Sequence, residues 1–227
     1  MGWNQLWINK NNGNPSLFKG IAKNLSDNII INFPLRNDMN VLDFGCGPGY
    51  LSMFIHNKVD KLYIHDASPT MARKSRENTS GMKNVIYVER IDDYSFPPLD
   101  YIFINSVIQY VSYTELIEIL FSLKKLLKKD GKIVISDILT EPCKLISETI
   151  ISIYYSITHG YGLGQFKHLF SFFFSNYLQL NKKQPLNYYT QKQINQIAQQ
   201  LHFRVMFLEK NLIYNRRCTV YFEEING

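Results

Sequence analysis

The sequence contains little cysteine. Its 227 residues include three cysteines, Cys46, Cys143 and Cys218, at unrelated spacings. An odd number at such spacings excludes the disulfide framework of small secreted domains and offers no metal-ligand pattern. We therefore expect no metal site, and a cytoplasmic protein with reduced thiols.

Long apolar segments are also missing. The first 20 residues contain no apolar core of the kind found in signal peptides. The most apolar stretch, "FKHLFSFFFSNYLQL" at 166–180, is too short and too often interrupted by polar residues to span a bilayer. It could lie at a membrane interface with Lys182 and Lys183 near the headgroups, but we favour a helix that covers a substrate pocket.

Acidic residues are outnumbered by basic ones, 19 to 25, which gives a net charge of +6. This excess favours an anionic partner, such as a phosphorylated substrate, a nucleic acid or a membrane surface. Small scattered basic clusters are nevertheless most typical of solvated helix faces. The clusters are Arg73, Lys74 and Arg76; Lys124, Lys125, Lys128 and Lys129; Lys182 and Lys183; Arg216 and Arg217.

The first two thirds of the chain alternate between strand and helix patterns. Strands are predicted at 40–45, 61–66, 84–89, 100–106 and 132–139, and helices at 50–59, 68–78 and 113–129. Ser68 is the expected N-cap of the second helix, and Asp130–Gly131 the expected end of the third. This alternation predicts a mostly parallel sheet with helices on both faces.

The alternation stops after the fifth strand. Residues 141–189 are aromatic and contain few strand signals, so we expect an inserted helical cap that selects the substrate. A capping box at Thr190 and Gln193 then opens a helix, and strands follow at 203–211 and 217–225. The whole chain, 1–227, is expected to form one domain, with residues 1–37 as an N-terminal helical lid.

The stretch "VLDFGCGPGY", residues 41–50, places a glycine turn directly after the first strand. Its spacing is G-x-G-x-G, whereas the dinucleotide fingerprint is G-x-G-x-x-G, with a pyrophosphate at a helix N-terminus. Asp43 just before the turn would repel phosphate and attract a cation. The turn therefore indicates a ligand that has positive charge and no phosphate.

The stretch "VLDFGCGPGYLSMFI" resembles the first motif of class I S-adenosylmethionine-dependent methyltransferases. Asp66 ends the second strand about 20 residues later, the spacing expected of a carboxylate that holds ribose hydroxyls. "SPTM", "VIYVERIDDYSFPPLDYIFINSVIQYV" and "LLKKDGKIVISDIL" are similar to later regions of the family, so the resemblance covers residues 38–140. It implies a Rossmann-like α/β fold, with a mostly parallel seven-stranded sheet whose last strand is antiparallel.

The resemblance also implies which residues bind S-adenosylmethionine. The methionine end is expected at Asp43 and the glycine turn, the ribose at Asp66, and the adenine at Ile91 and Asp92, for which Asp93 is an alternative. Cys46 is expected to be a small residue of the turn and not a nucleophile. The implied cofactor-binding residues are Asp43, Gly45, Cys46, Gly47, Gly49, Asp66, Ala67, Met71, Ile91, Asp92, Asn105 and Ser106.

Polar residues after the fourth strand are expected to orient the methyl acceptor. Asn105 and Tyr110 are the candidates there, in "NSVIQY". The stretch lacks the Asn/Asp-Pro-Pro-Tyr/Phe motif of enzymes that methylate base amines, which favours a small-molecule acceptor. A hydroxyl acceptor has a high pKa, so O-methylation benefits from a nearby base; His159 and His168 are the candidates, with Asp137 and Glu141 as alternatives.

The sequence thus predicts a methyltransferase acting on an oxygen or nitrogen of a small molecule, such as a sugar or a phosphorylated biosynthetic precursor. Two alternatives remain. One is an RNA or protein methyltransferase that uses the basic clusters as its footprint. The other is a non-catalytic protein that retains the cofactor pocket. Nucleic acid and membrane contact are not favoured, and the sequence leaves the oligomeric state open.

Overall fold

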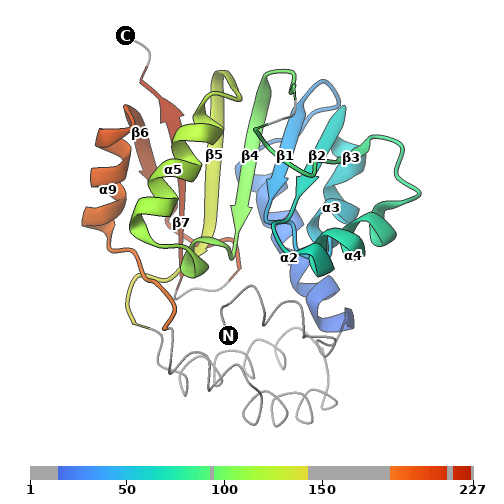
Figure 1. Ribbon diagram of the computed structural model, residues 1–227, viewed down its shortest axis with the longest axis horizontal. Helices are drawn as coiled ribbons and strands as arrows, with labels where there is room; N and C mark the ends of the chain where they lie inside the picture. Colours follow the sequence, from blue (N-terminus) through green and yellow to red (C-terminus); the bar gives the residue numbers. More distant parts are fainter. Residues whose placement is uncertain (1–14, 93–94, 143–184, 214–216, 226–227) are drawn as a thin grey trace, which may run out of the picture.

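The fold is described from a computed structural model. The described residues are 15–92, 95–142, 185–213 and 217–225, and they form one α/β layered structure (Figure 1). No helix among these residues has both the length and the apolar character needed to cross a membrane.

A seven-stranded sheet in the order β3-β2-β1-β4-β5-β7-β6 forms the centre of the structure. Neighbouring strands from β3 to β5 are parallel, whereas β7 is antiparallel to both β5 and β6. This confirms the predicted mostly parallel sheet with an antiparallel last strand. The strands are β1 (Asn40–Phe44), β2 (Lys61–His65), β3 (Val85–Tyr87), β4 (Leu99–Asn105), β5 (Leu127–Ile138), β6 (Phe203–Phe207) and β7 (Cys218–Glu224).

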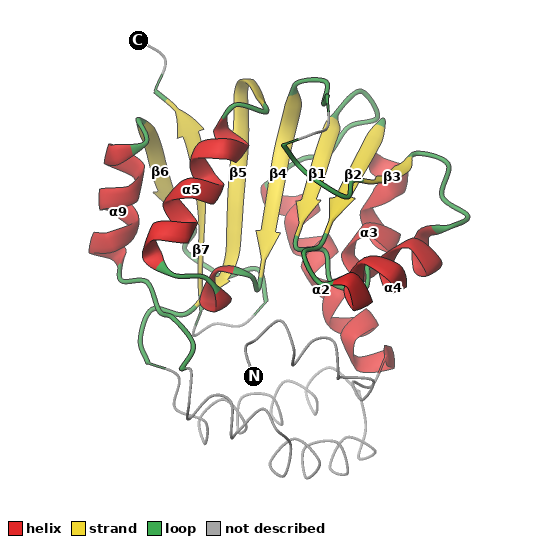
Figure 2. Cartoon of the chain, viewed as in Figure 1, coloured by secondary structure: helices red, strands yellow, loops and turns green. Residues whose placement is uncertain are grey.

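Helices cover both faces of this sheet (Figure 2). Helices α5 and α9 lie on the front face in this view, and α2 and α3 lie behind it. The helices are α2 (Pro15–Asn32), α3 (Tyr50–Ile55), α4 (Pro69–Thr79), α5 (Tyr113–Lys124) and α9 (Gln191–Gln200), with 3-10 turns η1 (His56–Lys58) and η2 (Ile108–Tyr110). The expected caps are present, because Ser68 accepts the N–H of Met71 and Thr190 forms a capping box with Gln193.

The strands have two hydrophobic faces because successive side chains point to opposite sides. Leu42 and Ile133 belong to the core beneath α5 and α9, whereas their neighbours Val41 and Val134 belong to the core beneath α2 and α3. All four side chains are at most 1% exposed. Two separate cores, one on each face, hold the parallel strands in register.

Helix α2 is part of the segment that the sequence predicts to be a lid. Leu25, Ile29 and Phe33 are buried in the core behind the sheet, so this part of the segment packs as a structural helix. The first 14 residues lie outside the described residues, as do 143–184 of the predicted cap. The lid and cap roles therefore stay predictions.

The boundary between α5 and β5 differs from the sequence prediction. Helix α5 ends at Lys124, and β5 already begins at Leu127, so Asp130–Gly131 lies within a strand and does not end the helix. The β4–β5 register shifts at this point. A Cβ on Gly131 would lie 2.7 Å from the carbonyl oxygen of Leu99, so glycine is required by close strand approach.

Four of the five parallel strands, β2, β1, β4 and β5, end at the same side of the sheet, here called the carboxyl edge. The opposite side is called the amino edge. Residues that follow these four strands are therefore neighbours in space, although they lie far apart in the sequence.

Candidate functional site

The glycine turn follows β1 at the carboxyl edge. Gly45, Gly47 and Gly49 all have positive φ, at 73°, 56° and 77°. A Cβ on Gly45 would collide with the side chain of Val107, so the turn packs tightly against the segment that follows β4. A Cβ on Gly47 would meet no atom of the described residues within 4 Å. The turn therefore presents bare backbone to open space at Gly47, which fits a ligand that approaches the main chain closely.

Asp66 follows β2 and faces the glycine turn. Its two carboxylate oxygens accept the backbone N–H groups of Gly47 and Ser68, each at 2.8 Å. Burial raises the pKa of Asp66, while these two N–H donors oppose the rise. Because a carboxylate has about four acceptor positions, the group can still accept two hydroxyl donors. Its place beside Gly47 suits the predicted ribose contact.

Asp43 lies beneath the turn, at the end of β1. It is 2% exposed, and its Oδ2 accepts a hydrogen bond from Ser52 Oγ at 2.8 Å. Burial raises the pKa of Asp43 to about 7, the Ser52 hydroxyl lowers it, and the charge of Asp66 raises it. The structure therefore gives the two carboxylates different environments: Asp66 borders the turn, and Asp43 is enclosed below it.

Cys46 is also enclosed by the turn. Burial, followed by the negative charges of Asp43 and Asp66, raises the pKa of its thiol well above the usual range. Because the thiolate is the nucleophilic form, this environment disfavours nucleophilic chemistry at Cys46. It is consistent with the expected role as a small packing residue.

Two hydrogen bonds join the ends of β4 and β5. Ser136 Oγ donates to Asn105 Oδ1 at 2.7 Å, and Ser106 Oγ donates to Asp137 Oδ2 at 2.7 Å. Ser106 and Asp137 both adopt left-handed backbone conformations, with φ of 56° and 62°. Arg217, which precedes β7, lies with its Nε 3.6 Å from Asp137 Oδ1. These residues lie beside the glycine turn, because Val107, which packs on Gly45, directly follows Ser106.

The other predicted site residues occupy more varied positions. Met71 opens the first turn of α4, Ala67 is exposed beside it, and Tyr110 lies in η2. Ile91 is half-buried and packs against the front core, whereas Asp92 is exposed. His159, His168 and Asp93 lie outside the described residues.

Sequence reasoning missed three residues of this edge. Val107 and Ser52 are ordinary apolar and polar positions of their segments, and no local pattern links them to the turn. Arg217 was interpreted as part of a solvated basic cluster, but its side chain is 12% exposed and it pairs with Asp137, so that interpretation is wrong for this residue. The signal that could have identified it is its position immediately before an apolar strand.

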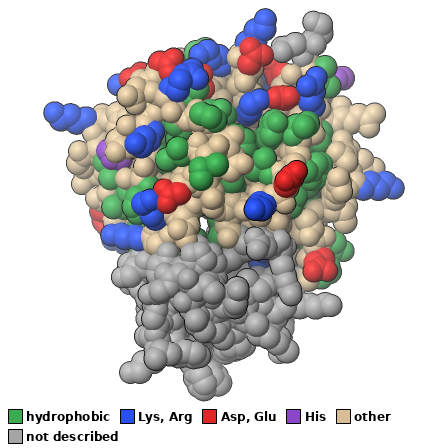
Figure 3. Space-filling model, turned by 180° about the vertical axis from the view of Figure 1, so that it is seen from behind, with side chains coloured by type: hydrophobic (Ala, Val, Ile, Leu, Met, Phe, Trp, Pro, Cys, Tyr) green, Lys and Arg blue, Asp and Glu red, His purple; other side chains and the backbone are tan. Residues whose placement is uncertain are grey.

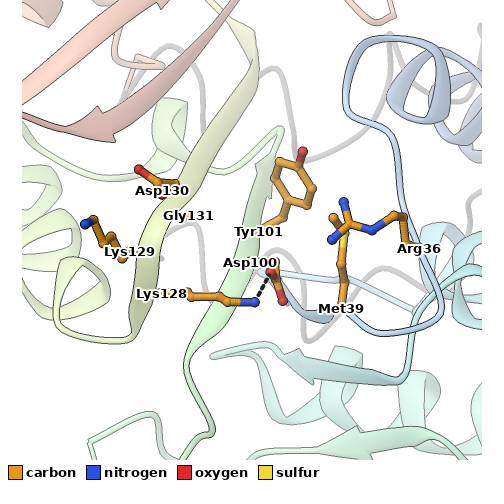
Figure 4. A pocket seen from close by; sticks show the side chains of 8 residues that line it. All are labelled: Arg36, Met39, Asp100, Tyr101, Lys128, Lys129, Asp130 and Gly131. Atoms are coloured by element: carbon orange, nitrogen blue, oxygen red, sulfur yellow. Dashed lines mark hydrogen bonds and ion pairs between the residues drawn. The ribbon is translucent and has the colours of Figure 1, made fainter.

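A surface hollow of about 280 Å³ lies elsewhere, at the amino edge (Figure 4). It is lined by Arg36, Met39, Asp100, Tyr101 and Lys128–Gly131. Lys128 Nζ donates to Asp100 Oδ1 at 3.0 Å across it. None of the predicted site residues lines this hollow, which is on the opposite side of the sheet from the glycine turn.

Solved structures share the fold at low sequence identity. An S-adenosylmethionine-dependent methyltransferase of Aquifex aeolicus aligns with a TM-score of 0.59 and 19% identity, over 93% of this chain and 98% of that one. Magnesium protoporphyrin IX methyltransferase of Synechocystis, with bound S-adenosylhomocysteine, aligns at 0.58 and 13%, over 97% and 92%. Phosphoethanolamine N-methyltransferase 1 of Haemonchus contortus aligns at 0.53 and 20%, over 63% of this chain, which spans 33% of that longer protein. At these identities the alignments demonstrate the fold.

Family membership comes from the sequence match. Among curated proteins, none matches this chain. A family model described as a methyltransferase domain matches residues 17–206, well over half of the chain, and this range includes the glycine turn and the strand ends beside it. The chain therefore belongs to the methyltransferase-domain family, and the predicted class I enzyme that uses S-adenosylmethionine as methyl donor is confirmed.

Proposed function

We propose that this enzyme transfers a methyl group to an oxygen or nitrogen of a small molecule, such as a sugar or a phosphorylated biosynthetic precursor. The observation that carries the proposal is the open backbone of Gly47 beside the carboxylate of Asp66 at the carboxyl edge. A ligand can approach the main chain closely at Gly47, and its hydroxyl groups can donate hydrogen bonds to the adjacent carboxylate.

The order of the strands supports one direction for the proposed cofactor. Asp66 follows β2, so the ribose lies there, and the adenine extends toward Ile91, beyond β3. The methionine portion then extends the other way, over the glycine turn at the end of β1. The methyl group would emerge near the ends of β4 and β5, where Asn105 and Ser106 lie. Ala67 and Met71, at the start of α4, would border the adenosine.

Asp43 would act on the cofactor mainly through its charge. Its carboxylate is enclosed, so its negative field reaches a bound cation across the glycine turn through a medium of low dielectric constant. A cation placed there favours the ionised form of Asp43. Cofactor binding is therefore expected to release a proton near neutral pH, because Asp43 of the free protein is partly protonated there.

The chain's own contribution to methyl transfer is alignment. The sulfonium of S-adenosylmethionine supplies an electrophilic methyl group without help from the protein. Asp66 and the glycine turn would fix that group, and polar side chains after β4, among them Asn105 and Tyr110, would orient the acceptor in line with the methyl–sulfur bond. His159 and His168 stay predictions for a base.

Two observations favour a small acceptor. Structural neighbours include a mitomycin 7-O-methyltransferase and an O-methyltransferase family 2 protein in complex with apigenin. In addition, the basic cluster around Lys124 and Lys128 engages this chain itself: Lys124 Nζ donates to the carbonyl of Leu201, and Lys128 pairs with Asp100. Lys128 and Lys129 lie at the amino edge, away from the glycine turn, where they would be a poor footprint for an RNA substrate.

Replacement of Asp66 tests the cofactor assignment. We expect Asp66→Ala to weaken S-adenosylmethionine binding by about ten- to a hundredfold, because hydrogen bonds to a charged group contribute about 1.5–3 kcal/mol. Titration calorimetry measures the affinity. Asp60→Ala removes an exposed carboxylate at the opposite end of β2 and is the matched control. An Asp66→Ala protein that binds as tightly as wild type would contradict the ribose assignment.

Labelled cofactor tests the acceptor class. The protein is incubated with methyl-labelled S-adenosylmethionine and a fractionated extract of its host. Label in the small-molecule fraction supports the proposal, whereas label in RNA or protein supports the first alternative. Cofactor binding with no transfer to any fraction would support a non-catalytic protein.

A further inference from the structure

The cluster formed by Ser106, Asp137 and Arg217 has features that packing alone does not require. Ser106 and Asp137 are non-glycine residues in left-handed conformations, each at the end of a strand, and such conformations cost free energy. They lie on adjacent strands and their side chains are joined by a 2.7 Å hydrogen bond. The backbone supports the same arrangement, since the N–H of Ser106 donates to the carbonyl of Ser136 at 3.2 Å.

The carboxylate of this cluster lies beside a cationic side chain. Asp137 is 9% exposed, and an isolated buried carboxylate is strongly disfavoured. The guanidinium of Arg217, contributed by the segment before β7, compensates its charge at 3.6 Å. The other carboxylate oxygen of Asp137 accepts a hydrogen bond from the hydroxyl of Ser106, which follows β4. Of these two partners of Asp137, Arg217 carries the charge and Ser106 is neutral.

The direction of the Ser106–Asp137 bond has a chemical consequence. The Ser106 hydroxyl donates a hydrogen bond to Asp137. The lone pairs of Ser106 Oγ are therefore oriented away from the carboxylate. Ser106 is half-buried, and the residue after it packs on the glycine turn. A polar group on the far side of Ser106 would meet an oxygen that is ready to accept a hydrogen bond.

We propose that Ser106 accepts the proton that the methyl acceptor loses, and that Asp137 is the residue that positions Ser106 and receives the proton in turn. This inference rests on the proposed small-molecule methyl transfer. As the acceptor oxygen or nitrogen forms its bond to the methyl carbon, the carbon–sulfur bond breaks and its electron pair stays on sulfur. The acceptor's proton moves to Ser106 Oγ while the hydroxyl proton of Ser106 moves to Asp137 Oδ2. The products are S-adenosylhomocysteine, the methylated acceptor and a protonated Asp137, which returns its proton to solvent.

A carboxylate is basic enough for this task. Formation of the new carbon–oxygen or carbon–nitrogen bond places positive charge on the acceptor atom, and its proton becomes far more acidic than in the free acceptor. Proton loss can therefore accompany methyl transfer, with a carboxylate as the final base. Ser106 would be the catalytic residue in contact with the acceptor, and Asp137 a positioning residue that acts through it.

Steady-state kinetics with methyl-labelled S-adenosylmethionine and the small-molecule extract of the host test this inference. We expect Asp137→Asn to lower kcat by about 100-fold and to lack the decline of rate toward acidic pH that the proposal predicts for wild type. Cofactor affinity, measured separately by calorimetry, should stay within about threefold of wild type. Asp137→Glu should restore part of kcat and the acidic pH dependence.

Ser106→Ala provides the second measurement. It should lower kcat to a similar extent, and the double variant should lose no more than either single variant, because the two residues act as one unit. Asp60→Asn, an exposed carboxylate at the amino edge, is the control and should keep wild-type kcat. A wild-type kcat in either Asp137→Asn or Ser106→Ala would overturn the inference, as would losses that multiply in the double variant. If Asp137→Asn does not fold, Ser106→Ala alone decides. A wild-type protein that transfers no label would instead contradict the proposed function.

Discussion

At the scale of single residues, burial changes the chemistry of the two carboxylates most closely associated with the glycine turn. Asp66 keeps access to a ligand while two backbone N–H groups hold it in place. Asp43 is enclosed and accepts a hydrogen bond from Ser52, and its pKa rises to about 7. An aspartate within a strand, such as Asp43, therefore differs in protonation behaviour from one that directly follows a strand, such as Asp66.

Asp43 gives a prediction about stability and pH. Between its ordinary pKa of 3.8 and about 7, the unfolded chain is ionised at this position while the folded chain keeps the proton. The unfolded state then binds fewer protons, so the stability contributed by this group falls as the pH rises through that window. Asp43→Asn removes the effect. We expect the free energy of unfolding of the variant, minus that of wild type, to increase by up to about 4 kcal/mol from about pH 4 to about pH 8.

Denaturant unfolding of the ligand-free protein at several pH values measures this difference. Ser52→Ala should raise the pKa of Asp43 further, because it removes the hydrogen bond that favours the ionised form. The midpoint of the pH-dependent change should therefore move upward in that variant. A difference between Asp43→Asn and wild type that does not vary with pH would contradict the assignment.

At the scale of elements, β5 depends on a close approach that only glycine allows. Gly131 lies in the part of β5 where the register with β4 shifts, and an added Cβ would be 2.7 Å from Leu99 O and 2.8 Å from Lys128 O. Backbone atoms in a buried sheet cannot move aside as the end of a flexible side chain can. The amino-terminal part of β5 is therefore sensitive to the addition of a single methyl group.

Two glycine substitutions test this point. Gly131→Ala should lower the free energy of unfolding by about 1–3 kcal/mol, the usual cost of forcing atoms into a packed site. Gly81→Ala is the matched control, because a Cβ there meets nothing within 4 Å and its φ is not positive. It should change stability by no more than about 0.5 kcal/mol. Equal effects of the two substitutions in denaturant unfolding would contradict the packing argument.

Sequence patterns predicted the elements well where local signals determine them. The G-x-G-x-G turn, the Ser68 cap and the Thr190–Gln193 capping box depend on neighbouring residues, and each is present. The boundary at Lys124 was missed because Leu126 and Leu127 continue the helical apolar pattern, and only pairing with Leu99 reveals them as the approach to a strand. Tertiary pairing overrode local periodicity there.

At the scale of the whole molecule, charged side chains surround an apolar area on the back face. Figure 3 shows apolar side chains in the middle of this face, with many charged side chains above them and others along the sides. Arg36, Lys128 and Lys129 line the hollow at the amino edge. The net charge of +6 therefore says little by itself about the ligand at the carboxyl edge.

Neutralisation of the amino-edge cluster tests whether that charge serves catalysis. We expect the double variant Lys128→Gln, Lys129→Gln to keep wild-type cofactor affinity and methyl transfer, and to lose less than about 1 kcal/mol of stability, since Lys128 pairs with Asp100 at an exposed site. Calorimetry and label transfer at two salt concentrations measure these quantities. A marked loss of transfer, restored at low salt, would indicate a nucleic-acid footprint at this edge.

The candidate site could be predicted only in part from the sequence. Gly47 and Asp66 belong to a motif with fixed spacing, so their proximity was expected. The pairing of Asp137 with Arg217 was not, because β7 must cross to the edge of β5 before the two meet, and no local pattern records that crossing. Contacts between segments distant in the chain come from topology, and a single sequence carries little information about them.

The position of β7 also determines the order in which the molecule can be assembled. β6 is synthesised before β7, yet β7 lies between β6 and β5 in the sheet. During translation β6 has no strand to pair with until β7 has left the ribosome and joined β5. A nascent chain that ends within β6 would possess the glycine turn and Asp66 but would lack Arg217, the partner of Asp137. The predicted cofactor-binding part of the site can thus form before β6 is complete, whereas the proposed acceptor side needs a residue that is made after β6.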